Sequence, residues 1–137
     1  MQPGDGSERN SACILIKLIS RKNNMGLKLL SIDPTQDHPR YTEAQLARRV
    51  GGPEAWSFAM TQQMPRGQAD KLVCGLKSIG IDFEELIRDM EISWLNCCET
   101  ADKIQDNLSQ LGSDEKHKRW WQGIADEWKH SGGIRLV

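Results

Sequence analysis

One stretch of this sequence, Asp82 to Leu111, constrains the fold more than any other. Its apolar residues recur at spacings that alternate between four and three, as in a helix whose apolar seam packs on other helices. They are Phe83, Ile87, Met90, Trp94, Cys97, Ala101, Ile104, Leu108 and Leu111. Asp82 and Glu85 have the spacing of a helix start, and Gly112 is a natural stop. The pattern predicts one helix of about 29 residues, roughly 43 Å long.

Composition and length indicate one soluble domain. The chain has 137 residues, of which 38% are hydrophobic and 27% charged. No apolar run approaches the length of a membrane span, and no leader or lipidation motif is evident, so we expect a cytoplasmic protein without membrane contact. Cys13, Cys74, Cys97 and Cys98 lack C-x-x-C spacing. We therefore expect reduced thiols, with no metal and no cofactor.

The net charge of −1 hides an uneven distribution. Seven acidic residues lie between Phe83 and Leu111 in the predicted long helix, against Arg88 and Lys103. They are Glu84, Glu85, Asp89, Glu91, Glu99, Asp102 and Asp106. A solvated polar face explains this most simply, and docking of a basic protein partner on the acidic face of helix 83–111 is the alternative.

The first forty residues contain two apolar runs. Residues 1–10 are polar and aperiodic, which predicts a disordered tail. Ala12 to Ser20 and Leu27 to Ile32 then form either a β-hairpin or two short helices, and we favour a helix for the first run because the rest of the chain has helical patterns. Asp33 to Arg40 contains two prolines and predicts an exposed loop, with His38 in solvent.

Three short helices are predicted next. Thr42 and Gln45 form a capping box for a helix that ends at Gly51. Pro53 suits the first turn of a second helix, which extends to Met64 before Pro65. A third begins near Arg66 and breaks at Gly80.

A last helix from Asp114 to Lys129, capped by Ser113, is predicted to fold back antiparallel on the long one. The fold class expected from these patterns is mainly α. Residues 11–137 would form a single helical domain, with a short-helix cluster at 42–81 and a helical hairpin at 82–130.

The segment Thr42 to Ile87 resembles the helix-turn-helix domain of the Cro/C1 repressor type. Thr42-x-x-Gln45-Leu46-Ala47-Arg48-Arg49-Val50-Gly51 is similar to the first helix of that family, and Ile79-Gly80-Ile81-Asp82-Phe83-Glu84-Glu85-Leu86 to its end. The resemblance implies a small regulator of double-stranded DNA, with helix Pro53 to Met64 in the major groove. The DNA-contacting residues would be Arg48, Arg49, Ser57, Thr61, Gln62, Gln63, Arg66 and Lys71.

Tryptophans dominate the C-terminal part and suggest self-association. Trp120, Trp121 and Trp128 add more aromatic surface than a two-helix contact readily buries, so with Trp94 they are predicted to form a homodimer interface between C-terminal helices.

An alternative function needs no nucleic acid. The predicted recognition helix contains no Lys or Arg, although phosphate contacts call for cations. No nucleophile elbow, P-loop or HExxH motif indicates an enzyme. The alternative is a non-enzymatic helical interaction protein: an adaptor, assembly subunit or inhibitor.

Overall fold

An antiparallel sheet runs through the structure and contradicts the mainly helical prediction. A computed structural model describes residues 26–137, so the predictions for residues 1–10 and 12–20 lie outside the described part. Within it, five strands form one sheet in the order β2-β1-β5-β4-β3. The strands are β1 (Leu27–Ser31), β2 (Thr61–Met64), β3 (Ile87–Arg88), β4 (Glu91–Ile92) and β5 (Ile134–Leu136). The fold is therefore mixed α/β, although helices make up most of it.

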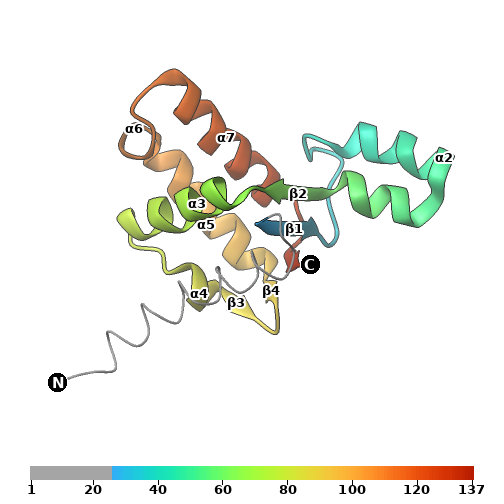
Figure 1. Cartoon of the computed structure of the whole chain (residues 1–137), viewed down its shortest axis with the longest axis horizontal. Helices are drawn as coiled ribbons and strands as arrows, with labels where there is room; N and C mark the ends of the chain where they lie inside the picture. The colour runs from blue at the N-terminus through green and yellow to red at the C-terminus, as the bar shows by residue number, and fades with distance from the viewer. Residues whose placement is uncertain (1–25) are drawn as a thin grey trace.

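The helices lie between these strands in sequence. They are α2 (Tyr41–Ala59), α3 (Arg66–Ser78), α4 (Phe83–Leu86), α5 (Trp94–Asp106), α6 (Leu108–Leu111) and α7 (Glu115–Lys129). Figure 1 shows α3, α5 and α7 gathered on one side, while α2 projects away from the rest. The predictions for α3 and α7 are confirmed closely, although the N-cap of α7 is Asp114, whose carboxylate accepts from His117 N, rather than Ser113.

The run from Leu27 is a strand, so a short helix there was wrong. β1 pairs with β2 on one side and with β5 on the other. Both edges of β1 are therefore paired with strands of the described part of the chain. Its alternating burial places Leu27 and Leu29 on the face toward the helices. The opposite face of the sheet carries an ion pair, with Arg135 Nη2 2.9 Å from Glu91 Oε2.

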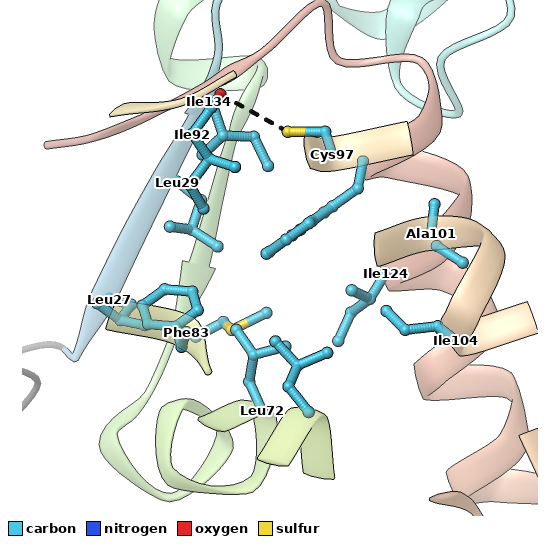
Figure 2. Packing of buried hydrophobic residues seen from close by; sticks show 14 of the residues in the cluster. Leu27, Leu29, Leu72, Phe83, Ile92, Cys97, Ala101, Ile104, Ile124 and Ile134 are labelled. Carbon is cyan, nitrogen blue, oxygen red and sulfur yellow. Dashed lines mark hydrogen bonds between the residues drawn. The ribbon is translucent and has the colours of Figure 1, made fainter. Parts of the chain in front are cut away.

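The core fills the space between this sheet and the helices α3, α5 and α7. Leu27 and Leu29 face Ile104 and Ile124 across it, as Figure 2 shows. Cys97 lies at one end, where its thiol donates to the Ile92 carbonyl at 3.7 Å. Burial raises the pKa of this thiol to about 12, so Cys97 is an unreactive core residue.

The long helix predicted from Asp82 to Leu111 is not continuous. It is interrupted by the β3–β4 hairpin, and Ser93 starts a new helix by accepting a hydrogen bond from Asn96 N at 3.2 Å. As the face of one helix the seam holds from Cys97 onward, where Ala101 and Ile104 are buried, while Phe83 is buried on the separate helix α4. Met90 and Trp94, expected in the seam, are 43% and 51% exposed.

The β3–β4 turn is strained. Arg88 pairs with Glu91 around a two-residue turn in which Asp89 and Met90 have φ of 53° and 64°. Both central residues are left-handed, as in a type I′ turn, which favours Asn-Gly. Met90 therefore holds a conformation that costs a non-glycine residue about 1 kcal/mol or more.

Replacing Met90 by Gly is expected to stabilise the fold by about 1 kcal/mol, because glycine adopts this conformation without strain. Urea unfolding of the purified chain measures the gain. Met90→Ala is the matched control, since it removes the same exposed side chain but keeps a Cβ. Equal stability of the two variants would show that the backbone of the turn is not strained.

Candidate interaction surface

The helix expected to read DNA does not exist as one element. α2 contains both halves of the predicted pair, separated at Gly52, whose φ of 74° breaks the helix into two. The second half ends at Ala59, and Thr61, Gln62 and Gln63 lie on strand β2 instead. Ser57 and these three residues therefore do not share a helix face.

The four cations proposed to flank DNA also lie on different elements. Arg48 and Arg49 are exposed on α2, whereas Arg66 and Lys71 belong to α3. Arg48 Cζ lies 5.6 Å from the Trp56 ring centroid, and Lys71 Nζ lies 4.4 Å from that of Trp120. Arg48 and Lys71 therefore contact aromatic rings, and the four cations do not lie together along one helix that could enter the major groove.

Most side chains of α2, here called the α2 arm (Tyr41–Ala59), are not buried. Its one buried side chain is Ala44. Leu46, Val50 and Phe58 are 57%, 93% and 71% exposed. Figure 1 shows its two halves side by side, projecting from the sheet next to β2. Because α2 buries only one side chain, its exposed apolar side chains are free to contact the surface of another molecule.

The two halves of the arm hold each other through aromatic contacts. Tyr41 and Trp56 pack edge to face, with ring centroids 5.4 Å apart at 90°. Arg48 lies over the same Trp56 ring. Leu46 and Val50 are four residues apart and so share a helix face. The contacts within the arm leave that face outward, since both side chains stay exposed.

An ion pair fixes the base of the arm to α7. Arg40 Nη2 lies 2.5 Å from Glu127 Oε1, and Arg40 Nη1 donates to the Thr61 carbonyl at 3.0 Å. Gln62 Nε2 donates to the other carboxylate oxygen of Glu127 at 2.7 Å. Thr61 Oγ1 donates to the Ser57 carbonyl at 2.7 Å and ties the arm to β2. These bonds hold the arm at a fixed place on the body.

The loop that leads into the arm is less exposed than predicted. His38 is buried, with Nε2 3.2 Å from Ser31 Oγ, and its Nδ1 accepts from Arg40 N at 3.1 Å. Burial, with a smaller effect of the nearby Arg40 charge, lowers the pKa of His38 to about 4. The imidazole is therefore neutral at neutral pH and acts as a structural acceptor for the loop.

The tryptophans expected at a dimer interface divide into two kinds. Trp121 and Trp128 are buried in the core of one chain, so neither presents a surface to a second copy. Trp120 is half-buried against the Trp121 ring at 4.9 Å, and Trp94 is 51% exposed, with Nε1 donating to the Lys129 carbonyl at 3.3 Å. The homodimer stays a prediction that now depends on Trp94 and Trp120.

The acidic residues assigned to one helix face are distributed over several elements. Glu84 and Glu85 lie on α4, Glu91 pairs with Arg135, and Asp102 lies 3.9 Å from Lys129 Nζ. They do not form the continuous strip that a single helix would present.

Other kinds of site find little support in the described chain. Among residues 26–137, no group of three or more His, Cys, Asp or Glu side chains could hold a metal ion. Within the same range, no helix is long and apolar enough to cross a membrane. Cys74, Cys97 and Cys98 are free thiols.

No protein-family model matches the chain, and neither a curated protein nor a solved structure shows significant similarity to it.

Two features of the sequence are related to this surface. Gly51-Gly52-Pro53 places a helix break and a helix start side by side, which is the pattern of a tight helical hairpin rather than of two core helices. Leu46 and Val50 share a face with no apolar residue at the next turn. The burial of Arg40 against Glu127, 87 positions later in the sequence, had no such local signal.

Proposed function

We propose that this chain is a non-enzymatic protein–protein interaction protein and that its α2 arm is the binding element. The observation that carries the proposal is the arm's exposed apolar face, presented by Leu46 and Val50 on an element fixed at its base. Side chains one turn apart on a projecting helix suit insertion into an apolar groove of a partner. Each would contribute about 1.5–3 kcal/mol when buried.

Charge favours a protein partner over DNA. The arm contains two arginines, Arg48 and Arg49, and two acids, Glu43 and Glu54, so its net charge is zero. Affinity for DNA depends largely on cations that neutralise phosphates. An electrically neutral arm with apolar side chains outward supports the interaction hypothesis, and the DNA hypothesis remains as the competing outcome of the test.

The decisive experiment measures how much partner is captured by variants that carry lysine at exposed apolar positions, either on the arm or on α5. A photo-crosslinker at Glu43, on the arm beside Leu46, captures the partner from an extract of the source cells. Leu46→Lys with Val50→Lys should reduce capture more than about tenfold, since burial of even one such side chain exceeds the 1.4 kcal/mol that a tenfold change represents. Leu95→Lys is the matched control, because Leu95 is 68% exposed on α5, away from the arm.

Binding to mixed-sequence duplex DNA at two salt concentrations tests the competing function. We expect no measurable binding. Salt-dependent binding that Arg48→Ala with Arg49→Ala weakens, together with capture unaffected by the lysine substitutions in the arm, would replace the interaction hypothesis with the DNA one.

A further inference from the structure

One edge of the sheet has unused main-chain groups. β2 is the outermost strand, and its register with β1 pairs Leu29 with Gln62 and Leu27 with Met64. Ser31 N donates to the Met60 carbonyl at 3.2 Å, so residues 60, 62 and 64 are the ones whose main chain bonds β1. The N–H and C=O of Thr61 and Gln63 therefore point outward from the sheet.

These two outward residues differ in what they contact. The Thr61 carbonyl accepts from Arg40 Nη1. Neither the N–H nor the C=O of Gln63 has a hydrogen-bond partner in the described chain. An unpaired main-chain donor and acceptor on one residue of an edge strand form the template to which another extended segment adds.

A groove lies alongside this edge, here called the β2 groove. It has a volume of about 430 Å³ and is lined by Pro39, Arg40, Gln62, Gln63, Gly123, Asp126 and Glu127. The far wall belongs to α7, where no atom other than those of the adjoining residues and helix backbone lies within 4 Å of the position that a Cβ on Gly123 would occupy. Gly123 thus leaves room beside the strand edge for side chains of an added segment.

The charge of the groove favours a basic occupant. Its lining carries two carboxylates, Asp126 and Glu127, and one guanidinium, Arg40, which is already paired with Glu127. Asp126 is exposed and accepts only the Gln122 amide at 3.0 Å among described residues. A Lys or Arg side chain entering over Gly123 would therefore meet an uncompensated carboxylate.

We propose that the β2 groove binds an extended segment of a partner protein that carries a basic side chain. The segment adds to β2 as a sixth strand, exchanging main-chain hydrogen bonds with Gln63, while its Lys or Arg pairs with Asp126. This binding mode uses the sheet edge and α7, and it does not depend on the α2 arm.

The test uses a fluorescein-labelled heptapeptide, Thr-Val-Thr-Lys-Thr-Val-Thr, and the same peptide with Glu in place of Lys, measured by fluorescence anisotropy with the full chain. The lysine peptide should bind with a Kd below about 1 mM and more tightly than the glutamate peptide. Asp126→Lys should reverse that preference.

Two pairs of variants separate the strand edge from the rest of the surface. Gln63→Pro removes the outward N–H at an edge position that tolerates proline and should weaken binding about fivefold, whereas Gln63→Ala should not. Gly123→Leu fills the groove and should abolish binding. Gly67→Leu is its control, because Gly67 is an equally open helical glycine on α3.

The proposal is overturned if neither peptide binds, or if Gln63→Pro and Gly123→Leu bind the lysine peptide as well as the unmodified chain does. If no peptide binds and sedimentation shows a dimer that Gly123→Leu dissociates, the groove accepts a second copy of this chain instead.

Discussion

Replacing Trp128 by Ala is expected to lower the free energy of unfolding by about 3–5 kcal/mol, which approaches the whole stability of many small domains. Trp128 is fully buried in the core between the sheet and the helices. Truncation removes the transfer free energy of the ring and leaves a cavity, because close-packed neighbours relax only partly. Urea unfolding followed by circular dichroism measures the loss.

Trp94→Ala is the control for this prediction. Trp94 is half-exposed, and we expect its loss to cost under about 1 kcal/mol, mostly the hydrogen bond to the Lys129 carbonyl. Trp128→Phe keeps a folded chain measurable if the alanine variant does not fold, and should cost less than the alanine change. A loss of stability for Trp94→Ala as large as that for Trp128→Ala would contradict this expectation and show that Trp94 packs in the core.

The seam from Phe83 to Leu111 shows what periodicity can and cannot decide. From Cys97 onward the spacing correctly gives the buried face of a helix, because packing on α7 and the helical repeat agree there. Upstream, Met90 and Trp94 fit the same spacing by coincidence. The residues that decide the local structure are Asp89, in a left-handed turn, and Ser93, a helix cap.

The sheet could not be read from the sequence because its strands are short and distant from one another. β3 and β4 have two residues each and β5 has three, too few for an alternating pattern. Leu29 pairs with Leu136, 107 positions later, so the strand at Leu27–Ser31 is stabilised by tertiary contacts. The helices α3 and α7, in contrast, carry local caps and breaks that act within a few residues.

The candidate surfaces show the same difference between features that local sequence determines and features that depend on tertiary contacts. The spacing of Leu46 and Val50 places them on one helix face, but nothing local in the sequence indicates that α2 projects from the body. Gln62 and Gln63 were singled out for base contacts. The structure places them on an edge strand, where the main chain of Gln63 points outward from the sheet.

The ion pair at the base of the arm leads to the second large expected effect. Arg40→Met should cost about 2–3 kcal/mol at neutral pH, since it leaves Glu127 charged without its partner. The loss falls below the range for fully buried pairs because the two side chains keep 26% and 15% of their solvent exposure. Adding Glu127→Met should recover most of the stability, since two apolar side chains leave no uncompensated charge.

The cost of Arg40→Met should also depend on pH. Burial raises the pKa of Glu127 above its usual value, and the Arg40 charge opposes that rise. Without Arg40 the folded-state pKa rises further, and a carboxyl group with a raised folded-state pKa stabilises the fold below its unfolded pKa and loses that contribution as pH rises. Arg40→Met should therefore cost most at neutral pH and least near pH 4.5, the usual pKa of a glutamate.

Urea unfolding of both single variants and the double variant at the two pH values gives the coupling energy directly. A pH-independent loss, or a double variant as unstable as Arg40→Met, would mean that Arg40 acts through packing and its bond to Thr61 rather than through the charge of Glu127.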